Sequence, residues 1–224
     1  MSELYEIMRT TFAARQFTDE SVPDAVLFKI LDNARFAPSG GNRQGWRVVI
    51  VRDRAIRETL AALCQPATRR YFAQVKAGEN PWNTIDPTKV DAATIEQMQP
   101  PASLTAQLTR APVVLVVCLD LKVVASLDQY LPRVGVISGG SVYPFVWNIL
   151  MAARHEGYGG NVTTLAVPEE SKIQELLGIP RHVAVAALVP LGRPTKNLTR
   201  LTRKPVSEFA FLVRWGGAPL APSG

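Results

Sequence analysis

A loop with the sequence APSGGNRQG gathers the side chains in this chain most suited to holding a small ligand. Gly40 and Gly41 permit positive φ angles and let backbone N–H groups converge on one point. Ser39, Asn42 and Gln44 add hydroxyl and amide groups that donate and accept hydrogen bonds. Such a loop suits a planar ligand with polar edges and a phosphate. A helix C-cap followed by a turn is the alternative, and it explains the glycines but not the clustered amides.

Two further stretches have a composition that suits a phosphate-bearing ligand. Residues 156–165, EGYGGNVTTL, resemble half of a dinucleotide fingerprint, but they follow a helical pattern where that fingerprint needs a strand. A helix C-cap with Gly157 just beyond the helix explains the same residues. Residues 200–206, RLTRKPV, carry three cations that either hold a phosphate or lie on the surface.

Side chains that do catalysis by themselves are scarce in this sequence. The two histidines, His155 and His182, have no candidate metal ligand beside them, and the two cysteines, Cys64 and Cys118, lie far apart. Neither spacing matches a zinc motif or a disulfide framework. We therefore expect no metal site and no Ser-His-Asp or Cys-His pair.

The elements that position these loops follow from the apolar pattern. The spacing predicts helices over residues 3–11, 21–40, 54–65 and 136–156, and strands over 46–53, 111–120 and 182–192. The segment 111–120 is apolar throughout, which is typical of a strand buried on both faces. The segment 136–156 is apolar nearly all round, which predicts burial against a second subunit. Its apolar residues are Val136, Ile137, Val142, Phe145, Val146, Ile149, Leu150 and Ala153.

The order of helices and strands lacks a regular βαβ rhythm and predicts one α+β domain over residues 1–215. Residues 66–103 contain five prolines and several aromatic side chains, so we expect an irregular lid or insertion there. Residues 216–224, GGAPLAPSG, read as a flexible tail.

Composition and charge argue against two classes of function, nucleic-acid binding and membrane spanning. The chain has 224 residues, of which 47% are hydrophobic, and a formal net charge of +6 that is scattered along the sequence. Scattered cations do not predict a nucleic-acid surface. The sequence has no apolar run of 18 residues and no signal-peptide core at its start, so we expect a cytoplasmic protein that does not span a membrane.

Four stretches, taken together and in this order, resemble the FMN-dependent nitroreductase family. They are RTTFAARQF, ARFAPSGGNRQGWRVVIV, GGSVYPFVWNILMAARHEGYGG and VPLGRPTKNLTRLTRKPVSEF. The resemblance covers residues 5–215 approximately. It implies a central, mainly antiparallel sheet flanked by helices, and an intertwined homodimer with two flavins at the interface.

The resemblance also implies which residues contact FMN. The first segment and the glycine loop would contact the phosphate, ribityl chain and pyrimidine ring, the second glycine stretch would run near the reactive N5 edge, and Arg203 would hold the phosphate. The implied residues are Phe12, Ala13, Arg15, Pro38, Ser39, Gly40, Asn42, Gly159, Gly160 and Arg203. Many relatives have Arg or His where this chain has Phe12, so the resemblance leaves the phosphate contact at this position open.

The lid residues Arg70, Tyr71, Phe72 and Trp82 are candidates to line the substrate pocket, or else they pack the lid to the body of the protein. The family's chemistry resides in the flavin, so no side chain is expected to be catalytic. The implied reaction is a ping-pong cycle in which NADH or NADPH reduces the flavin and a small electron-poor nitroaromatic or quinone is then reduced. Two alternatives stay open: another FMN reaction, such as ene reduction, dehalogenation or flavin breakdown, and a non-catalytic flavin-binding protein. Dehalogenating relatives carry a Glu-Tyr-Lys set on their lid that residues 66–103 do not match.

Overall fold

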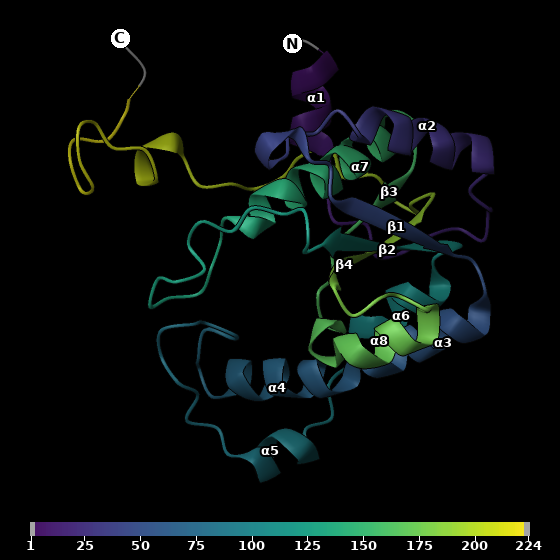
Figure 1. Cartoon of the computed structure of the whole chain (residues 1–224), viewed down its shortest axis with the longest axis horizontal. Helices are drawn as coiled ribbons and strands as arrows, with labels where there is room; N and C mark the ends of the chain where they lie inside the picture. The colour runs from purple at the N-terminus through teal and green to yellow at the C-terminus, as the bar shows by residue number, and fades with distance from the viewer. Residues whose placement is uncertain (1–2, 222–224) are drawn as a thin grey trace. The chain divides into compact units, whose positions relative to one another are not determined.

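A computed structural model describes residues 3–221 of the chain and divides it into two compact units (Figure 1). The larger unit spans Thr11–Asn197. The smaller unit combines residues 3–10 with residues 198–221. The larger unit contains the sheet and the helices that pack against it.

The sheet of the larger unit has four strands in the order β1-β2-β4-β3, and every pairing is antiparallel. The strands are β1 Trp46–Val51, β2 Val113–Asp120, β3 Gly159–Gly160 and β4 Val183–Gly192. Both central strands, β2 and β4, are almost entirely buried. The prediction of an α+β fold with a mainly antiparallel sheet is therefore confirmed.

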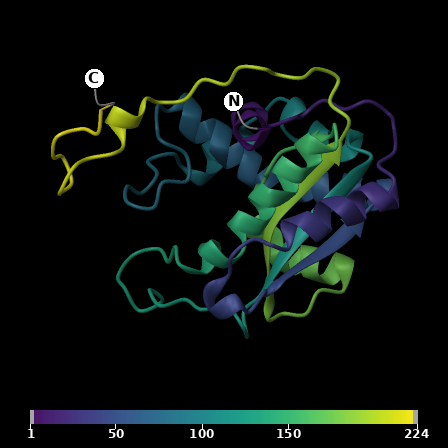
Figure 2. The same cartoon turned by 90° about the horizontal axis from the view of Figure 1, so that it is seen from above.

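Helices cover both faces of this sheet, as Figures 1 and 2 show. Successive residues of a strand point to opposite faces, and β2 illustrates the consequence. Val113, Leu115 and Val117 belong to the core under α2 and α7, whereas Val114 and Val116 belong to the core that contains α3, α6 and α8. The helices of this unit are α2 Asp24–Ala34, α3 Arg54–Leu63, α4 Gln65–Lys76, α5 Ala92–Gln97, α6 Ser103–Arg110, α7 Tyr143–His155 and α8 Glu170–Leu177.

Helix α7 is shorter than the predicted helix over 136–156. A 3-10 turn, Ser138–Ser141, precedes it, so Val136 and Ile137 lie outside the helix, and Pro144 occupies the first turn. The physical reason is local: paired glycines disfavour a continuous helix, while proline suits a helix start. Val136 and Ile137 therefore cannot extend the apolar surface of α7.

The buried face of α7 packs against the chain's own core. Ile149 is fully buried there between the sheet and α2. The opposite face exposes Tyr143 and Trp147, whose exposed fractions are 46% and 39%. A second copy of the chain could therefore contact Tyr143 and Trp147, but not Ile149.

The lid segment is more regular than its prolines suggested. Helix α4 begins at Gln65, and Pro66 lies in its first turn, where a missing N–H has no helical partner to lose. Pro66 therefore starts a helix, so the first part of the segment 66–103, which we expected to be irregular, is helical. The loop 77–91 and α5 follow, and α5 packs against α4.

The smaller unit contains α1 Glu3–Thr10 and a chain reversal near its C-terminal end. The apolar side chains Leu4, Tyr5 and Met8 of α1 are exposed. Phe211 pairs with Pro219 in an isolated antiparallel bridge, so part of the predicted flexible tail takes part in this reversal. Residues 222–224 of that tail lie outside the described residues.

Candidate functional site

The glycine loop before β1 adopts an unusual backbone. Gly41, Asn42 and Gln44 have φ angles of 61°, 53° and 50°. Asn and Gly occupy this left-handed region more readily than other residues do. The Ser39 hydroxyl accepts a hydrogen bond from the Gln44 backbone N–H at 3.0 Å, and the Ser39 carbonyl accepts one from the Asn42 N–H at 2.8 Å. Ser39 thus closes the loop on itself and holds it in one shape.

Contacts from residues distant in sequence anchor this loop. The Gly40 N–H donates to the hydroxyl of Ser141 at 3.1 Å, and Ser141 is buried just before α7. The Arg43 guanidinium donates to the carbonyl of Val123 at 3.3 Å. A methyl group on Gly45 would lie 2.9 Å from the Val123 side chain, which explains a glycine there. Sequence reasoning missed Ser141 and Val123, because no local pattern marks either residue as a partner of this loop.

The second glycine stretch pairs with the N-terminal segment. Ala13 forms a parallel bridge with Gly160, and the Ala14 N–H donates to the Gly160 carbonyl at 2.9 Å. The Asn161 side-chain amide donates to the Ala14 carbonyl at 2.6 Å and is itself only 2% exposed. The structure therefore brings the predicted residues 12–15 and 159–160 together. Asn161 is the residue that sequence reasoning missed, although it directly follows the two glycines.

Three glycines in this stretch have two different roles. Gly157 has φ of 79° and directly follows Glu156, the C-cap of α7, just beyond the helix as the sequence suggested. Gly159 and Gly160 are required by close packing instead. A methyl group would lie 2.8 Å from Pro194 at Gly159, and 2.6 Å from the Pro190 carbonyl oxygen at Gly160.

The two groups of predicted residues lie at opposite ends of the sheet. The glycine loop leads into Trp46, which pairs with Leu119 of β2. Gly160 pairs with Leu191, which in turn pairs with Val113 at the other end of β2. Because a strand rises about 3.3 Å per residue, the two ends are separated by roughly 20 Å along β2. Helix α7 runs between the same two regions, and its 13 residues at about 1.5 Å each give a similar length.

The predicted lid residues are not all in one place. The Arg70 guanidinium lies 4.5 Å from the centre of the Trp82 ring, and Trp82 lines a cavity of about 310 Å3. Tyr71 is exposed and Phe72 is half-buried, and neither lines this cavity. The other residues that line it are Ala67, Thr164, Leu165, Val167 and Pro168.

Two arginines and one proline of the predicted site are exposed to solvent. Arg15 is exposed beside β3, and its guanidinium donates to the Ala13 carbonyl at 3.4 Å. Pro38 is exposed at the start of the glycine loop. Arg203 belongs to the smaller unit, where its exposed guanidinium donates to the Thr202 carbonyl at 2.7 Å. Both arginines have further N–H donors to offer an anion.

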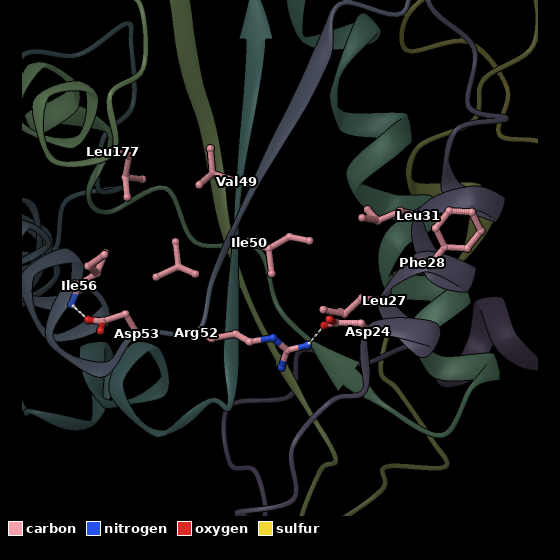
Figure 3. A pocket seen from close by; sticks show the side chains of 11 residues that line it. Asp24, Leu27, Phe28, Leu31, Val49, Ile50, Arg52, Asp53, Ile56 and Leu177 are labelled. Atoms are coloured by element: carbon pink, nitrogen blue, oxygen red, sulfur yellow. Dashed lines mark hydrogen bonds and ion pairs between the residues drawn. The ribbon is translucent and has the colours of Figure 1, made fainter.

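A larger hollow of about 720 Å3 lies along the outer edge of β1, between α2 and the helices α3 and α8 (Figure 3). Apolar side chains dominate it, including Phe28 and Ile50. Its polar groups serve the fold: Arg52 pairs with Asp24 at 2.6 Å, and Asp53 accepts a hydrogen bond from the Ile56 N–H at the start of α3. None of the predicted site residues lines this hollow.

The ionisable side chains of the core do not form a catalytic set. Burial raises the pKa of the Cys64 thiol to about 12, and burial with the nearby Glu170 raises that of Cys118 to about 11. Both thiols therefore stay protonated at neutral pH and are poor nucleophiles. Within residues 3–221, no three His, Cys, Asp or Glu side chains gather as a metal site would require, and no helix could span a bilayer.

Comparison with known proteins places this site in a family. A family model described as "Nitroreductase family" matches residues 8–193, which is most of the chain and includes the glycine loop and β3. The chain belongs to the nitroreductase family. The resemblance that the sequence motifs indicated is therefore confirmed.

Individual relatives of this nitroreductase-family chain differ in their named activities. An NADH dehydrogenase of Thermus thermophilus is 28% identical, and the match covers 82% of each chain. Human iodotyrosine deiodinase 1 is 25% identical over 94% of this chain and 68% of its own length. A crystal structure of an iodotyrosine deiodinase bound to FMN and 3-iodo-L-tyrosine superposes with a TM-score of 0.66 at 22% identity, covering 95% of this chain and 98% of that one. This last likeness concerns the fold.

Proposed function

We propose that this protein is an FMN-dependent oxidoreductase that uses NADH or NADPH to reduce small electron-poor substrates. The observation that carries the proposal is the pairing of segment 12–15 with Gly159–Gly160 inside the region that the family model matches. The FMN in the deiodinase structure of the same fold supports the choice of cofactor.

Several hydrogen-bond donors among the predicted cofactor-binding residues fit FMN. Arg15 and Arg203 offer guanidinium N–H groups, which suit a phosphate. The Ser39 and Asn42 side chains lie on a loop of fixed shape, and amide groups suit the polar edge of a pyrimidine ring. The backbone of Gly159–Gly160 would lie along the ring. When bound, FMN supplies the hydride chemistry, and the residues named here bind and orient it.

We further propose a homodimer in which each cofactor contacts both chains. Both the glycine loop and segment 12–15 are expected to contact the phosphate and ribityl part of FMN. Within one chain these segments are separated by roughly 20 Å along β2, which is too far for that part of one FMN molecule. Two copies packed through an isologous, two-fold interface would bring the loop of each to segment 12–15 of the other. The exposed side chains Tyr143 and Trp147 on α7 provide apolar surface for such an interface.

A second candidate is reductive dehalogenation, because human iodotyrosine deiodinase 1 is among the relatives. The lid of this chain argues against it. The Glu79 carboxylate accepts hydrogen bonds from the Thr88 hydroxyl and the Lys89 N–H, both at 2.7 Å, and these bonds lower its pKa. Glu79 is thus committed to the shape of the lid and has little capacity left for a substrate.

The test begins with the absorption spectrum of the purified protein and mass spectrometry of the cofactor released by heat. Anaerobic titration with NADH and with NADPH should bleach the flavin absorbance, and a nitroaromatic acceptor should restore it. Release of FAD, or no flavin uptake after incubation with FMN, would overturn the cofactor assignment. Turnover of iodotyrosine or a halophenol in preference to nitroaromatics and quinones would favour the second candidate. If the protein binds flavin but neither NADH nor NADPH reduces it, the result would favour a non-catalytic flavin-binding protein. The cytoplasmic location stays a prediction, which cell fractionation tests.

A further inference from the structure

The cavity beside Trp82 lies between the lid and the residues that follow the second glycine stretch. Ala67 and Trp82 line it from the lid, and Thr164 and Leu165 line it from the chain that follows Asn161. Its volume of about 310 Å3 is at the lower end of the ~300–1,000 Å3 that small-molecule sites span. The cavity therefore suits a molecule with a single aromatic ring.

Trp82 is held in a strained backbone conformation at this cavity. Its φ angle is 59°, a value that bulky side chains rarely adopt. The Trp82 N–H donates to the side-chain oxygen of the buried Gln74 at 3.3 Å, and the Gln74 amide donates to Glu79 at 3.1 Å. Glu79 in turn fixes the loop through Thr88. A strained residue held by such a hydrogen-bond network is a candidate for a functional role.

Arg70 is not one of the residues that line the cavity, but it provides a charge beside one that does, Trp82. Its guanidinium lies over the Trp82 ring at 4.5 Å, which fixes its position by a cation–π contact. The Nε atoms of Arg69 and Arg70 are buried without a hydrogen-bond partner, and in the described part of the chain no carboxylate pairs with either side chain. Within the described residues no hydrogen bond or ion pair holds the rest of the Arg70 guanidinium, so its terminal N–H groups can pair with an incoming anion.

We propose that this cavity binds the ring of an electron-poor aromatic acid and that Arg70 pairs with its carboxylate or sulfonate. This rests on the proposed function, because the same ring would face the flavin near segment 159–165. Arg70 and Trp82 then select the substrate: Trp82 provides an apolar wall for the ring, and Arg70 adds a charge-assisted hydrogen bond to its anionic group. Neutral acceptors of the same size lack the second contact.

Isothermal titration of the purified holoprotein with para-nitrobenzoate and with para-nitrobenzamide tests this directly. The two probes differ in charge and have nearly the same shape. We expect the acid to bind tenfold to a hundredfold more tightly, the range expected of a hydrogen bond to a charged group. Arg70→Gln should abolish this preference, and Arg70→Lys should restore part of it. Lys76→Gln is the matched control, because it removes one exposed positive charge from the same helix α4 and should leave the preference unchanged.

Equal binding of the two probes by the wild-type protein, or no binding of either, would overturn the proposal. So would a preference that survives in Arg70→Gln or disappears in Lys76→Gln. Turnover of a neutral quinone, measured separately, tests the proposed oxidoreductase activity independently of the aromatic-acid site. Quinone reduction without any preference for the acid would refute only the aromatic-acid site, whereas acid binding without reduction of any acceptor would refute only the proposed activity.

Discussion

Replacement of Gly160 by Ala tests whether β3 and segment 12–15 form one unit. A methyl group at Gly160 would lie 2.6 Å from the Pro190 carbonyl oxygen and 3.2 Å from the Leu150 side chain. The Gly160 backbone cannot move away freely, because it pairs with Leu191 on one side and with Ala13 on the other. The strands must therefore separate by several tenths of an ångström, which stretches the hydrogen bond from the Ala14 N–H to Gly160.

The cost follows from these contacts. Overpacking of a filled region typically costs about 1–3 kcal/mol. The weakened hydrogen bond adds roughly 0.5–1.5 kcal/mol. We expect Gly160→Ala to lower the free energy of unfolding by about 2–4 kcal/mol and to weaken FMN binding, because segment 12–15 is displaced with it.

Urea denaturation and flavin fluorescence titration measure the two effects. Gly140→Ala is the matched control: nothing lies within 4 Å of the new methyl group. That control should change stability by less than about 1 kcal/mol, including the loss of unfolded-state freedom that any Gly→Ala replacement brings. Equal unfolding midpoints and equal FMN dissociation constants for the two variants would refute the reasoning.

Three further outcomes are expected. Arg203→Ala should weaken FMN binding by about 2–3 kcal/mol, the scale of a hydrogen bond between charged groups, and by more than Arg15→Ala does; fluorescence titration giving an unchanged dissociation constant would contradict the phosphate assignment. Trp147→Asp should convert a dimer into monomers and reduce the FMN content, because it places an unpaired charge in the proposed interface; wild-type protein that sediments as a monomer with one tightly bound FMN per chain would argue against the shared site. Cys64 and Cys118 should resist a thiol reagent in native protein near neutral pH and react after unfolding, since their pKa values are raised to about 12 and about 11; fast labelling of the native protein would show that these thiols are accessible.

Elements with a strong local apolar pattern were predictable from the sequence. The strand expected over 111–120 corresponds to β2, Val113–Asp120, and the helix expected over 3–11 corresponds to α1, Glu3–Thr10. Both signals depend on neighbouring residues alone, which is why they survive in the folded chain. The prediction that the sheet is antiparallel came from the family resemblance, because the pattern of a strand alone does not specify which strands pair with it.

The errors arose where the local pattern is ambiguous. Apolar residues on both sides of Gly139 and Gly140 looked like one helix, but the structure has a 3-10 turn there and starts α7 at Tyr143. The prolines of residues 66–103 indicated an irregular segment, but the position of Pro66 in the first turn of α4 makes it compatible with the helix. In both cases the position of a residue within its element decided the outcome, and composition does not reveal that position.

For the candidate site, the sequence by itself determined the chemistry: a loop rich in donors, a second stretch of glycines, scattered arginines, and no catalytic His or Cys pair. It also determined the family, because four motifs in order are specific even at low identity. Tertiary structure alone decided which of these residues meet. It joined Gly40 to Ser141 and Arg70 to Trp82, and it separated the glycine loop from Gly160 by the length of β2. Such contacts join residues far apart in sequence, and they form only when the sheet and its two helical layers pack together.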